Sequence, residues 1–385
     1  MMELVYLDNN ATTRPAPEVV QAMLPYLTDF WGNPSSIHRF GQLARRGIDQ
    51  ARGQLAELLN VSESELFFTC GGTESINTAI RGLLATRAPR KRIVISAVEH
   101  SATRELCHQL AREGCQITEI SVDRTGALDL DQLRRSLDDD TALVSIMWAN
   151  NETGVLFPVQ RIAEICRAAR VPFHCDAVQA VGKIPTDFRA VGMDLASVAA
   201  HKFHGPKGVG ALYVRRGTRL CAWCVGGPQE RGRRGGTENV PGIVGMGMAA
   251  QLAREALPQM RRVAELRDML ERRILQAIPD THVNGRTDQR LPNTTNIGFA
   301  RLEAEAILLL LSEQGICASA GAACSSGSLE PSHVLRAMKI DEKIAHGAVR
   351  FSLSRYTTEA EIERTLAVLP GVITRLRAVL PVGVS

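Results

Sequence analysis

The sequence predicts an α/β protein with a large domain around a mostly parallel sheet and a smaller α+β domain. Short runs rich in β-branched and aromatic residues alternate with helical patterns through the first two thirds of the chain, which is typical of βα units. From about Leu257 the pattern changes to a long amphipathic helix and then to shorter strands and helices. The 385 residues leave room for two cores, because single cores stop growing near about 250–300 residues.

The candidate elements follow one another along the chain. Seven strands are expected in the large domain, at residues 65–70, 92–97, 116–121, 142–149, 171–177, 194–200 and 208–214. The smaller domain is expected to contain a helix at 257–278, a strand at 294–300, a helix at 303–314 and a strand at 348–354. We expect residues 15–257 to form the large domain, and residues 1–14 with 258–385 to form the small one. Ligands of parallel sheets collect outside the carboxyl ends of the strands, so polar residues at those ends are candidate site residues.

The charge balance favours neither a nucleic-acid nor a membrane partner. Lys and Arg total 45 against 41 Asp and Glu, a formal charge of +4. No apolar stretch approaches the roughly 20 residues that cross a bilayer, and the first ten residues lack the pattern of a secretory signal. We therefore expect a cytoplasmic protein.

The nine cysteines show no disulfide framework, which is typical of thiols in a reducing compartment. Cys221 and Cys224 have CxxC spacing, but neither a second pair nor a nearby pair of histidines completes a zinc site. His201 and His204 likewise lack a third ligand at the usual spacing. No metal site is expected.

A glycine pair ends the first candidate strand. Gly71 and Gly72 precede a helix expected to begin at Thr73 or Glu74, whose first N–H groups would form an anion site. Taken alone, a tight turn with Thr73 as the N-cap explains these residues better.

Two later strand ends carry ionisable side chains. Asp176 ends one strand, with Gln179 one turn later; the carboxylate could hold a protonated ring nitrogen, or it could equally cap the next helix. His201 and Lys202 stand between another strand and a glycine-rich turn. A lysine at a sheet end suits a Schiff base, because desolvation lowers its pKa and frees the amine.

Taken in order, these segments resemble the fold-type I pyridoxal-phosphate enzymes, specifically the class V group that contains the cysteine desulfurases. The resemblance runs from Tyr6 in YLDNNATT to about residue 358. It is most specific to the NifS-type desulfurases in WGNPSSIH, SAVEHSA, WANNETGVLFPV, DAVQAVGK, GGPQERGRRGGTEN, SAGAACSSGSLEPSHVLRAM and VRFSLSRYTT. Their joint, ordered occurrence is far more specific than any single motif.

This resemblance implies that pyridoxal 5'-phosphate is the cofactor. Lys202 would form the Schiff base, Asp176 would pair with the pyridine nitrogen, and His100 would stack on the ring. Gln179 and Asn151 would meet the phenolic oxygen. In the implied reaction with L-cysteine, Lys202 would move the α-proton and His100 would carry a proton near the thiol.

The same resemblance implies which residues contact the cofactor phosphate and the substrate carboxylate. The cofactor phosphate would be held by Gly72, Thr73 and His201. Thr237 of a neighbouring subunit would assist, which implies a homodimer. Arg350 and Asn33 would bind the substrate carboxylate, a role that suits a bidentate guanidinium, although Arg350 could also form a surface ion pair.

Cys324 is the residue that distinguishes a desulfurase from other members of the group. It stands among small residues without a helical period, which favours a mobile loop. Its thiolate would accept sulfur from L-cysteine, giving L-alanine and a persulfide. An inert buried thiol fits Cys107 or Cys166 better, and Cys317 is expected in the core.

One departure and several alternatives remain. Ala199 stands where the family usually has a hydroxyl residue that contacts the phosphate, and Cys70 and Cys175, beside the cofactor loops, have no assigned role. Selenocysteine lysis, another class V lyase or transaminase reaction, and a non-enzymatic scaffold are the competing functions. The resemblance also implies sulfur delivery to an iron–sulfur scaffold, including nitrogenase maturation, or to another acceptor protein such as one for tRNA thiolation.

Overall fold

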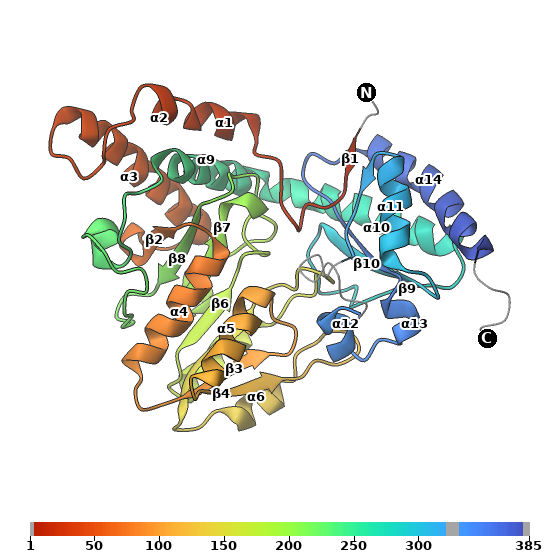
Figure 1. Cartoon of the computed structure of the whole chain (residues 1–385), viewed down its shortest axis with the longest axis horizontal. Helices are drawn as coiled ribbons and strands as arrows, with labels where there is room; N and C mark the ends of the chain where they lie inside the picture. The colour runs from red at the N-terminus through yellow and green to blue at the C-terminus, as the bar shows by residue number, and fades with distance from the viewer. Residues whose placement is uncertain (1–3, 321–330, 380–385) are drawn as a thin grey trace.

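A seven-stranded sheet forms the centre of the larger part of the chain (Figure 1). In this computed structural model, which describes residues 4–320 and 331–379, the strand order is β2-β8-β7-β6-β5-β3-β4. The strands are β2 Leu66–Thr69, β3 Arg92–Ser96, β4 Gln116–Ile120, β5 Thr141–Met147, β6 Phe173–Asp176, β7 Leu195–Ala199 and β8 Gly210–Val214. The pairings from β4 through β7 are parallel, whereas β8 runs antiparallel to β7 and β2. The predicted mostly parallel sheet, with strands at these seven places, is confirmed.

Helices cover both faces of this sheet, because alternate residues of a strand point to opposite sides. Ile93 and Ile95 of β3 pack with α4 and α5, whereas Val94 belongs to the core that includes α3, α7 and α9. The helices of this part are α1 Pro17–Met23, α2 Pro25–Thr28, α3 Arg39–Leu59, η1 Glu63–Glu65, α4 Gly72–Thr86, α5 Ser101–Arg112, α6 Leu130–Ser136, α7 Val159–Ala168, α8 Phe188–Val191, η2 Ala200–Lys202, η3 Gln229–Gly232 and α9 Val240–Ala256. Within the described ranges, no helix is long and apolar enough to cross a bilayer.

A separate core forms from the start of the chain and its last third. Val5 and Leu7 pack with apolar residues from Met260 onward. The elements of this part are β1 Val5–Tyr6, η4 Leu257–Gln259, α10 Met260–Ala277, β9 Thr281–Val283, β10 Thr294–Phe299, α11 Ala304–Glu313, β11 Ile316–Cys317, α12 His333–Ala337, α13 Glu342–Ala345, β12 Ala348–Ser352 and α14 Glu359–Ala378. However, α12 contributes Val334 and Leu335 to the core of the large sheet. The division at residues 14/15 and 257/258 stays a prediction.

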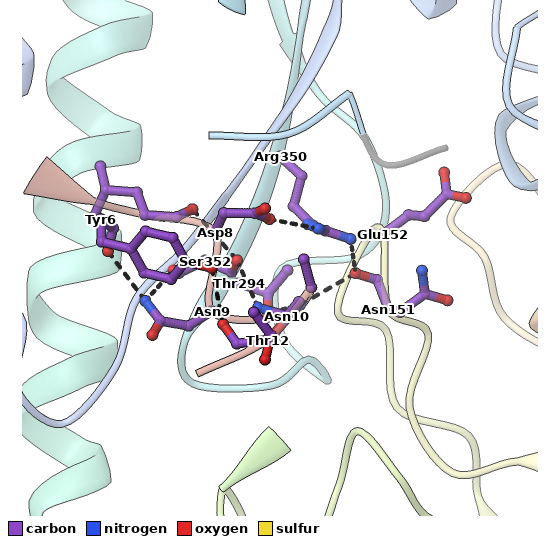
Figure 2. A network of polar contacts seen from close by, with 12 residues as sticks. Tyr6, Asp8, Asn9, Asn10, Thr12, Asn151, Glu152, Thr294, Arg350 and Ser352 are labelled. Carbon is purple, nitrogen blue, oxygen red and sulfur yellow. Dashed lines mark hydrogen bonds and ion pairs between the residues drawn. The ribbon is translucent and has the colours of Figure 1, made fainter. Parts of the chain in front are cut away.

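The N-terminal segment connects the two parts through Asn10 (Figure 2). The Asn10 N–H donates to Ser352 Oγ at 3.0 Å, and its Nδ2 donates to Thr294 Oγ1 at 2.8 Å, both on the small-domain sheet. The same Nδ2 donates to the Asn151 carbonyl at 3.1 Å, and Oδ1 accepts from Lys183 Nζ at 3.0 Å, both in the large domain. Since Asn10 is 1% exposed, these bonds satisfy groups that water cannot reach.

A buried ion pair holds η3, which lies in the segment between β8 and Thr237. Arg52 of α3 donates from both Nη atoms to the Glu230 carboxylate, at 2.9 and 2.8 Å. Glu230 also accepts the Phe68 N–H at 3.1 Å, and the guanidinium lies 4.7 Å from the Phe68 ring centroid. The two charges therefore balance each other, and Phe68 of the edge strand β2 contacts both of them.

Removing one member of this pair is expected to destabilise the fold. Glu230→Ala should lower the free energy of unfolding by about 3–5 kcal/mol, because Arg52 then stays buried without its partner. Asp49→Ala is the matched control, since Asp49 pairs with Arg45 at 3.1 Å on the exposed surface of α3, and it should cost less than about 1 kcal/mol. Urea denaturation of both variants measures the difference; equal losses would contradict the assigned importance of the buried pair.

Candidate active site

A cavity of about 280 Å³ lies at the carboxyl ends of β6 and β7. It is lined from the start of α4, the start of α5, the end of β5 and from β12. The predicted site residues in its lining are Gly72, Thr73, His100, Asn151, Asp176, Gln179, His201, Lys202 and Arg350. Residues that are far apart in the sequence are thus brought to one edge of the sheet, as expected for parallel strands.

Lys202 projects into the cavity from η2, directly after β7. Its Nζ donates to the carbonyl oxygens of Asn10 at 2.6 Å and Ala11 at 2.8 Å. The neighbouring His201 is half-buried, and its Nδ1 is 3.2 Å from Thr12 Oγ1. Burial, assisted by the charge of Lys202, lowers the pKa of His201 to about 4. The His201 ring is therefore neutral near pH 7, with one ring N–H to donate.

Asp176 is the last residue of β6 and is 6% exposed. Its Oδ1 accepts the Val178 N–H at 3.0 Å. It does not cap a helix, because turns follow β6 and the next helix, α8, begins only at Phe188. Burial raises the pKa of Asp176, against the opposing effect of His100. A carboxylate in this position is stable as an anion only beside a cation or several donors.

His100 caps the start of α5. Its Nδ1 accepts the Ala102 N–H at 3.1 Å, so the neutral ring carries its proton on Nε2. Burial lowers the pKa of His100, Asp176 opposes this effect, and Lys202 adds to it. A neutral imidazole with a defined tautomer is thereby fixed at the cavity wall.

The start of α4 differs from the prediction by one residue. The helix begins at Gly72 and its N-cap is Gly71, so neither a start at Thr73 or Glu74 nor Thr73 as the N-cap is correct. Gly71 has φ 157° and ψ −176°, a conformation open essentially to glycine alone. Gly72 and Thr73 line the cavity at the positive end of this 15-residue helix, beside Ala199. This end can hold an anion.

The sequence analysis missed two buried residues at the cavity, Lys183 and Asn10, of which Asn10 lines the cavity. Gln179 Nε2 donates to the Asn10 carbonyl at 2.9 Å, and Gln179 Oε1 accepts from Lys183 Nζ. Burial lowers the pKa of Lys183 well below its usual value, with the charges of Lys202 and Arg350 adding to the effect. Lys183 follows Gln179 by four residues in DAVQAVGK, but only the fold shows that both reach Asn10.

Arg350 lies on β12 and is buried rather than part of a surface ion pair. Its Nη2 contacts Asp8 Oδ1 at 2.7 Å and its Nη1 donates to the Asn151 carbonyl at 2.9 Å (Figure 2). Asn33 and Thr237 are exposed and do not line the cavity. Asn33 Oδ1 instead accepts the Ser35 N–H at 2.9 Å. The proposed roles of Asn33 and Thr237 stay predictions.

Cys324 lies outside the described residues, but both flanks of residues 321–330 are attached beside the cavity. Ser319 and Arg350 exchange two backbone hydrogen bonds, at 3.2 and 2.7 Å. On the other flank, Ser332 Oγ donates to Glu152 at 2.5 Å, and His333 Nε2 donates to the Glu99 carbonyl at 3.0 Å.

The other cysteines are free thiols in contrasting environments. Cys107 and Cys166 are buried, as predicted, and burial raises the pKa of Cys107 to about 12. Cys317 is only partly buried, in β11. Cys70 is exposed as a residue, but desolvation of its thiol, together with the adjacent Glu74, raises its pKa to about 11. Across residues 4–320 and 331–379, no cluster of three or more His, Cys, Asp or Glu could hold a metal ion.

Glu99 is a further buried acid that the sequence analysis missed. It precedes His100 and is fully buried. Its Oε1 accepts from Ser96 Oγ at 2.5 Å and from the Met147 N–H at 3.0 Å, whereas its Oε2 has no partner in the described part of the chain. Burial raises the pKa of Glu99 to about 8. The carboxyl is therefore largely protonated at neutral pH and connects the His100 turn to β5.

Comparison with known proteins gives a match to the family Aminotransferase class-V over residues 5–365. Cysteine desulfurase 2 of Trichormus variabilis is 54% identical over 380 residues, covering 99% of this chain and 96% of that protein. A cysteine desulfurase of Gluconacetobacter diazotrophicus is 54% identical over 383 residues, with 99% and 96% covered. Among solved structures, a NifS-like protein has a TM-score of 0.92 at 38% identity, covering 97% of this chain and 100% of that one. SspA in complex with cysteine has a TM-score of 0.81 at 33% identity, covering 92% and 99%.

The raised pKa of Glu99 predicts a specific dependence of stability on pH. An unfolded glutamic acid loses its proton near about pH 4.3, whereas folded Glu99 keeps it up to about pH 8. The contribution of protonated Glu99 to the free energy of unfolding is therefore fully present below about pH 4.3 and is lost as the pH rises through about 8. Glu99→Gln keeps the shape but cannot ionise. Between these values, the wild type should lose up to about 1.4 kcal/mol of unfolding free energy per pH unit relative to Glu99→Gln.

Denaturation curves over this pH range measure the effect. Glu105→Gln on α5, which removes an exposed carboxyl group, is the control for the loss of one acid. Parallel pH profiles for the wild type and Glu99→Gln would contradict a protonated Glu99.

Proposed function

The chain belongs to the class-V aminotransferase family and is a pyridoxal-phosphate-dependent cysteine desulfurase, and we propose that it acts by moving the sulfur of L-cysteine to Cys324. One observation carries the proposal: Lys202, the buried Asp176 and the start of α4 meet in one cavity. They do so in a chain 54% identical to a curated cysteine desulfurase over 99% of its length.

The donor set of the cavity fits the cofactor. Lys202 Nζ would bind its aldehyde carbon, and the N–H groups at Gly72 and Thr73, with His201, would hold its phosphate. Asp176 would face a protonated ring nitrogen, which supplies the cation that this buried carboxylate needs. When bound, pyridoxal phosphate supplies an electron sink that weakens bonds at the α-carbon of an amino acid.

The remaining cavity residues orient the ring and the substrate. His100 would stack on the ring, and Asn151 would face the phenolic oxygen. Gln179 Nε2 has two hydrogens and donates one bond to Asn10, so the second can serve the same oxygen. Arg350 would bind the substrate carboxylate with the help of Asn33, in competition with Asp8 for the guanidinium.

Proton movements fall to Lys202 and His100. The Lys202 amine, released when the substrate binds, would remove the α-proton at Nζ and return a proton to the product. Nε2 of His100 carries a proton that it can exchange with the substrate or with the attacking thiol. Because burial lowers the pKa of this histidine, its ring is neutral near pH 7 and presents the Nε2–H to the cavity as a donor.

Sulfur transfer balances without an outside reductant. The Cys324 thiolate forms an S–S bond to the substrate sulfur while the substrate Cβ–S bond breaks, and protonation of the carbon skeleton gives L-alanine. L-cysteine and one thiol thus become L-alanine and one persulfide. The attachment of both flanks of residues 321–330 beside Arg350 and Glu99 supports access of Cys324 to the cavity.

We further propose that the enzyme is a cytoplasmic homodimer that supplies sulfur to an iron–sulfur scaffold or another acceptor protein. Thr237 would reach the phosphate in the partner subunit, which agrees with its exposure on the single chain. Large apolar side chains are exposed in the same loops as Asn33 and Thr237: Ile37 is 97% exposed, Val225 84% and Trp31 71%. Such side chains favour an interface.

The nucleophile can be tested with two cysteine variants. Cys324→Ala should reduce L-alanine and sulfide production from L-cysteine, with reductant and added cofactor, by at least about 1,000-fold, because the attacking group is lost. Cys70→Ala is the control and should keep activity, since the raised pKa of Cys70 disfavours its thiolate. The visible cofactor band should be unchanged in both. Equal activity of wild type and Cys324→Ala would overturn the assignment.

The proposed phosphate site at the start of α4 can be tested by placing a hydroxyl group at position 199. Ala199→Ser should tighten pyridoxal-phosphate binding by about ten- to a hundredfold, the effect of one added charge-assisted hydrogen bond. Titration of the apo-enzyme gives the dissociation constant. Ala149→Ser adds a hydroxyl to a cavity residue that follows β5, and it should have little effect. An unchanged constant for Ala199→Ser would contradict a phosphate at the start of α4.

A further inference from the structure

An arginine-lined hollow of about 650 Å³ lies at the opposite end of the sheet from the active site. Pro172 precedes β6, Asp194 precedes β7 and Arg215 follows β8, so the hollow forms where β6 and β7 begin. The active-site cavity lies where the same two strands end. The arginines that line this arginine hollow are Arg87, Arg167, Arg170, Arg215, Arg216 and Arg219.

The charge of the arginine hollow is not balanced by its own acids. Asp194 is the only acid among the described lining residues, and both of its carboxylate oxygens are engaged. Oδ2 accepts the Phe173 N–H at 2.9 Å, and Oδ1 pairs with Arg215. Six arginines and one aspartate leave five positive charges in excess, more than the +4 of the whole chain. The nearby Glu65 is also committed, because it accepts the N–H groups of Arg216 and Ser62.

Two of the guanidinium groups converge on one acceptor. Nη2 of Arg167 and Nη1 of Arg215 both donate to the Gly192 carbonyl oxygen, at 3.3 and 3.4 Å. Since both contact the same oxygen, the two cations lie close together and repel each other. An anion between them would remove that repulsion.

Arg87 contributes a third guanidinium group to the hollow. Nη2 of Arg87, at the end of α4, donates to the Arg170 carbonyl at 3.1 Å. Arg170 adopts φ +56°, which is unfavourable for a residue with a side chain. Nε of Arg87 is inaccessible to solvent and has no hydrogen-bond partner among the described residues. Burial, together with the nearby Arg90, lowers the pKa of Arg87.

We propose that the arginine hollow binds a small polyphosphate anion, either inorganic or the phosphate chain of a nucleotide. Guanidinium groups bind phosphate oxygens bidentately, and several of them from separate segments can surround a chain of phosphates. The hollow has the size of a small-ligand site, about 300–1,000 Å³. None of its described lining residues is aromatic, so it offers no platform for stacked bases of a nucleic-acid strand.

Isothermal titration of the cofactor-loaded enzyme with sodium tripolyphosphate at low salt tests the proposal. Arg167→Gln should weaken binding by at least about tenfold, because one charge-assisted contact is lost. Arg161→Gln is the matched control: it lies on the same helix α7 and changes the net charge equally. Arg161 pairs with Glu164 at 2.8 Å and does not line the hollow, so its loss should change affinity less than about twofold.

ATP separates the two possible sources of the phosphates. Equal affinities of ATP and tripolyphosphate, both reduced by Arg167→Gln, support a site that recognises the phosphate chain in either form. Tighter binding of ATP with the same sensitivity to Arg167→Gln supports a nucleotide as the source. No binding of tripolyphosphate, or equal weakening by Arg167→Gln and Arg161→Gln, overturns the proposal.

The unfolding midpoint and the cofactor absorbance band of each variant show whether it is folded and cofactor-loaded. If Arg167→Gln fails to fold, Arg219→Gln, which changes the segment after β8, takes its place with the same expected loss.

Discussion

The geometry of the active site depends on the hydrogen bonds of one buried residue, Asn10. Its side chain is bonded to Thr294 of the small-domain sheet and to Lys183 of the large domain, while its carbonyl accepts from both Lys202 and Gln179. An unsatisfied buried donor or acceptor costs about 1–3 kcal/mol. A shift of one domain against the other would break several of these bonds together, so the position of the lysine is coupled to the position of the small domain.

The same network orients the residue proposed to bind the substrate carboxylate. Ser352, which accepts the Asn10 N–H, and Arg350 are two residues apart on β12 and so face the same side of the strand. Because Ser352 is bonded to the N-terminal segment and Arg350 to Asp8 of that segment, the strand cannot rotate or slip without losing both contacts. Because Ser352 and Arg350 share one face of β12, the contact of Ser352 with the N-terminal segment also fixes the orientation of the Arg350 guanidinium.

The sequence predicted what depends on local pattern and missed what depends on distant partners. The seven strands of the large sheet were correctly predicted because most of them are short, buried runs bounded by turn residues, although the edge strand β4 is only partly buried. Asp176 and Lys202 were brought together because parallel strands end at one edge. The start of α4 was misplaced, since the backbone conformation of Gly71 rather than a side-chain cap decides it. Lys183 was missed because its partner Asn10 is 173 residues away. The arginine hollow was hidden by the nearly balanced charge of the whole chain.

Burial pushes the ionisable groups of the active site towards neutrality: it raises the pKa of Asp176 and lowers those of His100 and Lys183. A ligand with a cationic ring nitrogen and an anionic phosphate would oppose this loss of charge at Asp176. In the proposed site, the ring cation would restore the charge of Asp176, and the phosphate would meet the positive end of α4 at Gly72. Cofactor binding would therefore create the charges used in the reaction, whereas the protein supplies fixed positions and a partly buried cavity in which those charges would act strongly.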